Sequence, residues 1–152
     1  MRVIEVTSIT EEILVSFREL IPQLSSSSKV PTRSQLKTIV SSESARLFVA
    51  RDPDQGNRIV GTLTLVLFRL PTGMRAWIED VVVDKSARRQ GVGESLCRVA
   101  IEQAEIAGSR TVDLTSRPIR EAANRLYQRM GFSIRETNVY RHIRNGKGFD
   151  QV

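Results

Sequence analysis

The chain has 152 residues and a net charge of +6 at pH 7, and 40% of its residues are hydrophobic while 26% are charged. This balance is ordinary for a globular protein and excludes disordered, collagen-like and coiled-coil chains. At roughly 100 to 200 residues per domain, the length predicts one domain, which we place at residues 1–144 with a frayed tail at 145–152.

The N-terminal segment and the scarcity of cysteine and histidine limit the cellular compartment and the chemistry. Residues 1–6 include acidic and polar side chains where a secretory signal needs an apolar run, and no 18-residue apolar run follows. We therefore expect a cytoplasmic protein with no membrane contact. The lone Cys97 and the lone His142 form no zinc or thiol-redox spacing, so we expect no metal.

The first third of the chain predicts a strand followed by two helices. Residues 3–7 alternate as in a strand, and the helical pattern that begins at Thr10 should be broken by Pro22 and the serines at 25–28. A second, short helix is expected over residues 31–40.

Three strands follow. Residues 46–51 and 59–70 are separated by the turn formers at 52–57, which predicts a hairpin. A further turn leads into a strand at 74–83, whose run of three valines is typical of a strand covered on both faces.

The last part of the chain changes period. Helical spacing begins at Gly91 and ends at Gly108, and a short strand, a helix and a closing hairpin are then expected, at residues 111–115, 118–130, and 132–136 with 139–143. The order β-α-α-β-β-β-α-β-α-β-β predicts an α/β (α+β) fold, with a mixed central sheet flanked by helices.

The segment 78–95 runs from a strand through a basic, glycine-containing turn into a helix. The first N–H groups of a helix lack partners within it, so a pyrophosphate binds well there. Gly91 and Gly93 would let phosphate approach the backbone, and Arg88 and Arg89 would add positive charge. The alternative is a tight turn with solvated arginines.

Two other nucleotide sites are excluded by the residues present. No Gly-Lys-Ser/Thr occurs, as a nucleoside-triphosphate loop requires. Gly91-Val92-Gly93 lacks the third glycine and the acidic residue about 20 positions later that a dinucleotide site requires.

A second segment projects polar groups together from the expected helix at 118–130. Arg120, Asn124 and Tyr127 are spaced i, i+4 and i+7 and share one face of that helix. The structural alternative for Tyr127 is a ring packed at the core edge with its hydroxyl in water.

Together these segments resemble the GNAT superfamily of acetyl-CoA-dependent N-acetyltransferases. Two motifs carry the resemblance, over residues 78–133: Arg88-x-x-Gly91-x-Gly93, and Asn124-x-x-Tyr127 followed by Gly131-Phe132. The resemblance implies acetyl-CoA as the cofactor and assigns two groups of binding residues. These are Val81, Val82 and Val83 for the pantetheine arm, and Arg88, Arg89, Gln90, Gly91, Val92, Gly93, Glu94 and Ser95 for the pyrophosphate.

The resemblance also implies roles near the reacting thioester. Asn124 would contact the cofactor near its thiol end, and Tyr127 would be the general acid toward the departing thiolate. An amine with a lysine-like pKa of about 10.4 is neutral in roughly one molecule in 2,500 at pH 7, so removing its proton is the larger demand.

Glu79 and Asp80 are the nearest candidates for the base. Strand alternation predicts that Glu79 shares a face with Val81 and Val83 while Asp80 faces away, so we prefer Glu79. A structural carboxylate paired with an arginine, a role for Asp80, and a base acting through water stay open.

The expected function is direct acetyl transfer from acetyl-CoA to a primary amine, of a protein or a small molecule. The resemblance implies that the acceptor would bind between residues 13–40 and 133–144, where no motif indicates its identity. The alternative is a noncatalytic module that binds nucleic acid or a protein partner, because residues 117–152 carry eight basic and three acidic side chains. Few aromatic residues accompany them, so we regard nucleic acid as the weaker reading. The oligomeric state stays open, a homodimer included.

Overall fold

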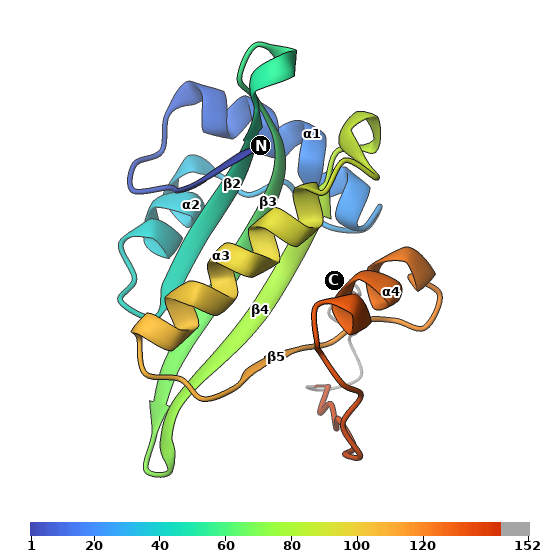
Figure 1. Ribbon diagram of the computed structural model, residues 1–152. Coiled ribbons are helices and arrows are strands. Elements are labelled where there is room, and N and C mark those ends of the chain that lie inside the picture. The colour runs from blue at the N-terminus through green and yellow to red at the C-terminus, as the bar shows by residue number, and fades with distance from the viewer. Residues whose placement is uncertain (144–152) are drawn as a thin grey trace.

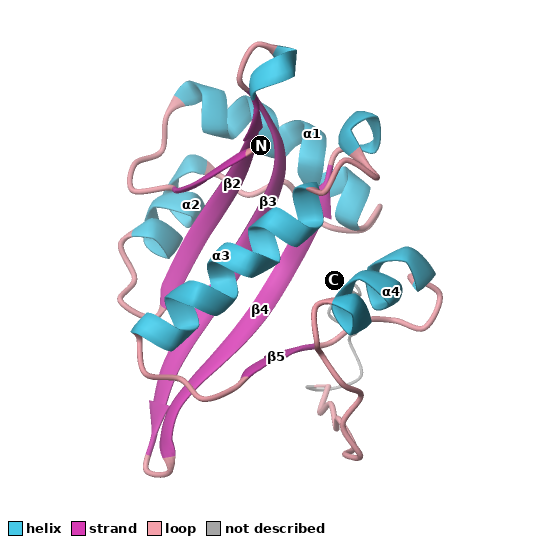
Figure 2. Ribbon diagram, viewed as in Figure 1, coloured by secondary structure: helices cyan, strands magenta, loops and turns pink. Residues whose placement is uncertain are grey.

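The computed structural model describes residues 1–143, which form one sheet with helices on both faces (Figures 1 and 2). The elements in chain order are β1 (Arg2–Glu5), α1 (Glu11–Leu24), α2 (Arg33–Val40), β2 (Ala45–Asp52), β3 (Arg58–Leu70), β4 (Gly73–Val83), α3 (Val92–Ile106), β5 (Val112–Leu114) and α4 (Glu121–Arg129). Two single-turn 3₁₀ helices, Pro53–Gln55 and Lys85–Ala87, lie in the connections. The mixed α/β architecture predicted from the sequence is confirmed.

The sheet has the strand order β1-β2-β3-β4-β5, and only the pairing of β4 with β5 is parallel. Helix α3 crosses one face of it, and α1 and α2 cover the other (Figure 1). Strand β2 is apolar on both faces of the sheet. Phe48 and Ala50 enter the core under α3, while Leu47 and Val49 enter the core under α1 and α2.

Helix α3 lies close to β3 because β3 carries Gly61. A Cβ atom at Gly61 would come within 2.9 Å of Val92 Cγ1 and 3.1 Å of Leu96 Cδ1. The missing side chain therefore lets the first turn of α3 rest on the sheet, which places the N-terminus of α3 beside the end of β4.

Helix α1 begins at a side-chain cap and ends at the C-cap residue Ser25, in the serine run where the sequence predicted a break. The Thr10 hydroxyl accepts a hydrogen bond from the N–H of Ile13 at 3.3 Å. The expected break at Pro22 is wrong, because the helix continues through Pro22 to Leu24. Pro22 is exposed, so water can satisfy the one carbonyl that loses its partner.

Strand β4 contains a β-bulge that the sequence did not reveal. Thr64 pairs with Glu79 and Thr62 with Val82, so Asp80 and Val81 together oppose a single residue of β3. Asp80 has φ of +51°, a left-handed conformation, as occurs at one type of bulge. The bulge shifts the side-chain alternation of β4 by one residue.

The predicted closing hairpin is wrong for the residues that are described. No strand forms over 132–136 or up to residue 143, and Ile134, Val139 and Tyr140 are exposed. A strand needs a partner for its backbone groups, and the free edge of β5 offers a ladder of only three residues. The expected tail at 145–152 lies outside the described residues.

Candidate active site

The candidate site begins where β4 and β5 separate. The two strands pair only from Ala76 to Ile78 and from Val112 to Leu114. The bulge at Asp80 follows at once, and β5 continues away from β4 toward α4 (Figure 1). The end of β4 thus has no strand neighbour on its β5 side within the described residues.

Backbone groups of Val81 and Val83 face this open side. The N–H of Asp84 donates to Val60 O at 2.9 Å, so Asp84 points toward β3. Successive residues of an antiparallel strand direct their N–H and C=O groups to alternate sides, so Val82 also faces β3 while Val81 and Val83 face away. The Val83 carbonyl receives a long hydrogen bond from Arg88 Nε at 3.4 Å.

The turn between β4 and α3 presents a row of free backbone donors. In the described part of the chain, the N–H groups of residues 88–94 make no hydrogen bond, and the first intrahelical bond of α3 comes from Ser95 N to Gly91 O at 2.9 Å. Arg89 and Gly91 have φ of +65° and +77°. Where residues in left-handed and right-handed backbone conformations follow one another, successive N–H groups point toward a common position. Such a turn favours the binding of an anion.

Gly91 and Gly93 serve different purposes. A Cβ atom at Gly91 would have nothing within 4 Å, so the space beside this glycine is open to a ligand. A Cβ atom at Gly93 would lie 3.1 Å from Leu126 Cδ2 and 3.7 Å from Val83 Cγ2. Gly93 therefore also allows α4 to approach α3. The phosphate approach expected at Gly93 from the sequence stays a prediction.

The side chains of the same segment are exposed or engaged locally. Arg88, Arg89 and Gln90 are exposed, and Glu94 forms an ion pair with Arg98 one turn later at 2.6 Å. The Ser95 hydroxyl donates to Gly91 O at 3.0 Å. Since both donors of Ser95 are used within the helix, the binding capacity of the segment lies in residues 88–94.

Tyr127 extends from α4 at the edge of the cleft and packs on the core under α3. The pKa of its phenol is raised to about 12, chiefly by burial and also by nearby Cys97, against an opposing effect of Arg120. Its hydroxyl has no hydrogen-bond partner among residues 1–143. The phenol is therefore protonated at neutral pH and has a proton to donate. Cys97 itself is fully buried, as a small hydrophobic residue would be.

Asn124 shares this face of α4 but is partly occupied. Its amide nitrogen donates to the carbonyls of Arg117 at 3.0 Å and Pro118 at 3.4 Å. The side chain therefore shapes the loop between β5 and α4, and only its amide oxygen is left to meet a ligand.

Glu79 and Asp80 lie at the bulge, and the predicted face of Glu79 is wrong. Val81 and Val83 pack on the α3 side with Ile78, whereas Val82 enters the core under α1. Glu79 follows Ile78 and lies on the opposite face from Val81 and Val83 because the bulge inverts the alternation.

Both carboxylates have perturbed acidity. Although Glu79 and Asp80 are exposed, partial desolvation raises the pKa of Glu79, which a hydrogen bond from Trp77 opposes and the nearby charge of Asp80 reinforces. Partial desolvation also raises the pKa of Asp80, while Arg120 opposes that rise. Because the pKa of each carboxyl group is raised, each remains a candidate base.

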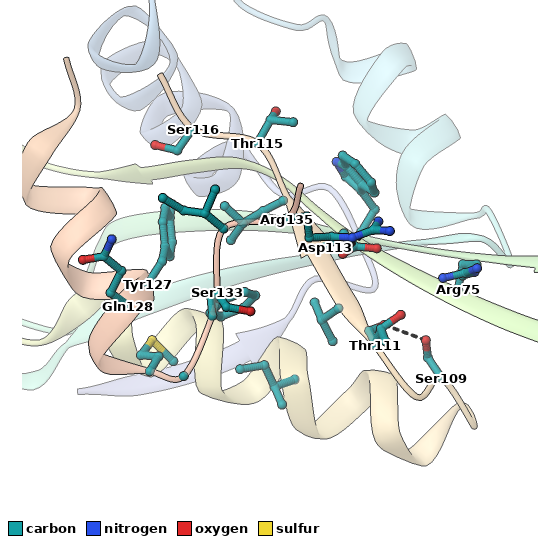
Figure 3. Close-up of a pocket in the computed structure, with 18 of the residues that line it drawn as sticks. Arg75, Ser109, Thr111, Asp113, Thr115, Ser116, Tyr127, Gln128, Ser133 and Arg135 are labelled. Atoms are coloured by element: carbon teal, nitrogen blue, oxygen red, sulfur yellow. Dashed lines mark hydrogen bonds and ion pairs between the residues drawn. The ribbon is translucent and has the colours of Figure 1, made fainter. Parts of the chain in front are cut away.

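A groove of about 910 Å³ lies along β5, between α4, the C-terminal half of α3 and residues 131–139 (Figure 3). Trp77, Tyr127 and Asn124 line it, and Arg135 approaches Asp113 across it at 3.9 Å. No residue of the expected acceptor helices at 13–40 contributes, so this groove adjoins the candidate site from the side away from α1.

Two absences hold for the described residues. Between residues 1 and 143, no helix has the length and apolar character needed to cross a membrane. Within the same range, His, Cys, Asp and Glu residues form no group of three suited to holding a metal ion.

Comparison with known proteins identifies the family. The Acetyltransferase (GNAT) family matches residues 8–132. This chain belongs to that family. Its members use acetyl-CoA, and the donor-rich turn at 88–94, with open space beside Gly91, fits the pyrophosphate of that molecule.

Individual relatives agree with this assignment. A curated relative, GCN5-related N-acetyltransferase 6, chloroplastic, from Arabidopsis thaliana, is 29% identical over 113 residues, which are 73% of this chain and 39% of that protein. The chain thus spans about two fifths of that relative.

Solved structures share the fold. A protein from Agrobacterium tumefaciens str. C58 has a TM-score of 0.80 at 23% identity, over 94% of this chain and all of that one. A transcriptional regulator from Bacillus halodurans C-125 has a TM-score of 0.75 at 27% identity, over 93% and 100%. AAC(6')-Iy, in complex with the bisubstrate analog CoA-S-monomethyl-acetylneamine, has a TM-score of 0.74 at 17% identity, over 94% and 97%.

Two residues at the site were not singled out by their sequence pattern. Asp84 is a buried carboxylate at the start of the donor-rich turn, and Gln23 contacts it from α1. Arg120 was expected to share a helix face with Asn124 and Tyr127, but its bond from Nη2 to Leu24 O at 2.9 Å was not expected. The Asp84-x-Ser86 spacing is a cap signal that could have indicated Asp84, but the contacts with α1 span 61 and 96 residues and leave no local signature.

Proposed function

We propose that this chain transfers the acetyl group of acetyl-CoA directly to a primary amine, with no covalent enzyme intermediate. The observation that carries the proposal is the run of unpaired N–H groups at 88–94, beside the open edge of β4. The bound thioester would supply an activated acetyl group. The residues of this chain would hold it, position the amine and move protons.

Each residue group has a physical task. The N–H groups of 88–94 would bind the pyrophosphate, and the outward backbone groups of Val81 and Val83 would pair with the pantetheine arm as a strand would. Glu79 or Asp80, directly or through water, would accept the amine proton. Tyr127 would donate to the sulfur, since its phenol is protonated near pH 7.

The acceptor amine is open between small molecules and proteins. The test is an acetyl-CoA turnover screen that measures the release of free thiol. The panel of amines includes polyamines, amino sugars, aminoglycosides and lysine peptides. Turnover with at least one amine class is expected. CoA binding that is absent from calorimetry, together with DNA affinity that falls steeply with salt, would instead favour the binding-module alternative.

A further inference from the structure

The last turn of α1 is hydrogen-bonded to the start of the donor-rich turn. Gln23 Oε1 accepts from the N–H of Lys85 at 2.9 Å, and Gln23 Nε2 donates to Asp84 Oδ2 at 3.3 Å. Nε2 also donates to Glu19 O at 3.0 Å, within α1. The amide of Gln23 thus contacts two successive residues of the segment that leads into the phosphate turn.

Asp84 accepts further hydrogen bonds at the start of the donor-rich turn. Its Oδ1 accepts from Ser86 N at 2.8 Å and from Ser86 Oγ at 2.6 Å, and its Oδ2 accepts from Arg58 Nη2 at 3.1 Å. These bonds hold the pKa of Asp84 below its ordinary value, the bond from the Ser86 hydroxyl contributing most. The carboxylate is buried and charged, so its partners keep definite positions.

Hydrogen bonds matter here because apolar packing is scarce. Between Lys85 and Gly91 only Ala87 is buried, and the other side chains are exposed. A turn with one buried methyl group has little hydrophobic restraint on its conformation. The contacts of Asp84 and Gln23 therefore supply much of the restraint on the entrance to the turn.

The same turn of α1 contacts the opposite side of the cleft. Leu24 O, next to Gln23, accepts from Arg120 Nη2 at 2.9 Å, and Arg120 is the N-cap residue of α4. Residues 23 and 24 thus connect α1 to the turn before α3 and to the start of α4. The cofactor cleft opens between these two elements.

We propose that Gln23 is a positioning residue for the pyrophosphate of acetyl-CoA. Its amide holds Lys85 and Asp84, and through them sets the direction of the N–H groups at 88–94. This inference rests on the proposed function, since it assumes that these groups bind the pyrophosphate. Gln23 does not touch the reacting atoms, so its loss should affect cofactor affinity more than the chemical step.

The test compares Gln23→Met with the wild type. Methionine keeps the length and apolar stem of glutamine but loses the amide bonds. The dissociation constant for CoA, measured by calorimetry, should rise about 5- to 20-fold, the expected effect of losing one or two hydrogen bonds to the turn. The KM for acetyl-CoA should rise by a similar factor, with kcat at saturation within about twofold.

Gln103→Met is the matched control. Gln103 Oε1 accepts from Arg46 Nη1 at 2.6 Å, a comparable side-chain contact that lies outside the site. Its loss should leave the CoA affinity unchanged. Melting temperatures of both variants, measured without ligand, show whether either substitution affects overall stability.

The outcomes separate this inference from the function it rests on. If the wild type binds CoA and Gln23→Met binds it equally well, or if both variants weaken binding equally, Gln23 is not a positioning residue. A loss of kcat with an unchanged KM would overturn the inference as well. If the wild type itself fails to bind CoA, the proposed function is at fault.

Discussion

The ring of Tyr127 stands edge-on to the ring of Phe132, with centroids 5.9 Å apart and planes at 67°. The pair closes the C-terminal end of α4, where the N–H of Phe132 donates to Tyr127 O at 3.0 Å. Edge-to-face packing of this kind restrains the orientation of both rings. The phenol of Tyr127 is therefore held in place by carbon contacts, which a phenylalanine would preserve.

Tyr127→Phe should lower kcat by about 10²- to 10⁴-fold, the range for a lost proton donor, and should leave the CoA dissociation constant within a few fold. The ring keeps its packing on Phe132, so the melting temperature should change little. Steady-state kinetics and calorimetry check these expectations. An unchanged rate, under conditions where the chemical step limits turnover, would leave Tyr127 with a packing role only.

Gly91→Asp should abolish detectable CoA binding. The substitution places a carboxylate in the open space beside the unpaired N–H groups, where it would repel the pyrophosphate. It also strains a residue at φ of +77°.

Gly56→Asp is the matched control for that strain. Gly56 has φ of +63°, has nothing within 4 Å of a built Cβ atom, and lies in the turn between β2 and β3. Both variants should lose similar stability, but only Gly91→Asp should lose CoA binding in calorimetry. Equal binding by the two variants would remove the phosphate turn from the proposal.

The pH dependence of kcat/KM should distinguish the two carboxylates. A carboxylate accepts a proton only above its pKa, and partial desolvation raises the pKa of both Glu79 and Asp80. The variant that lacks the base should be most impaired near neutrality, where few amine molecules are neutral, and should recover as pH rises.

Profiles of Glu79→Gln and Asp80→Asn, measured side by side with an amine of known pKa, check this expectation. The bulge places Glu79 on the face away from Val81 and Val83, so neither residue has a geometric advantage from alternation. A profile parallel to the wild type at every pH would withdraw the general-base role from the residue concerned.

Asp84 should make protein stability depend on pH in acid. Its folded-state pKa lies below the ordinary value of 3.8, so its stabilising effect is present above that value and is lost as pH falls through the lower, folded pKa. Asp84→Asn should reduce the free energy of unfolding by about 1–3 kcal/mol at pH 7. Urea unfolding at pH 7 and near pH 3 should show that this difference shrinks in acid. A difference of constant size would show that charge is not what stabilises Asp84.

The sequence by itself predicted the mixed α/β fold and the nine elements from β1 to α4, because their signals are local. Caps such as Thr10, the turn formers at 52–57 and the change of period at Gly91 each act within a few residues. The strand–turn–helix segment at 78–95 was predicted for the same reason. The closing hairpin was wrong because its alternation did not ensure a partner strand.

The tertiary structure alone decided how the site is arranged. The bulge at Asp80 depends on the register between β3 and β4, and it reverses the face on which Glu79 lies. The role of Gly93 depends on the approach of Leu126 from α4. The contact of Gln23 with Asp84 joins residues 61 apart. Each of these features depends on contacts between segments that are remote in sequence, and no local propensity or spacing predicts such contacts.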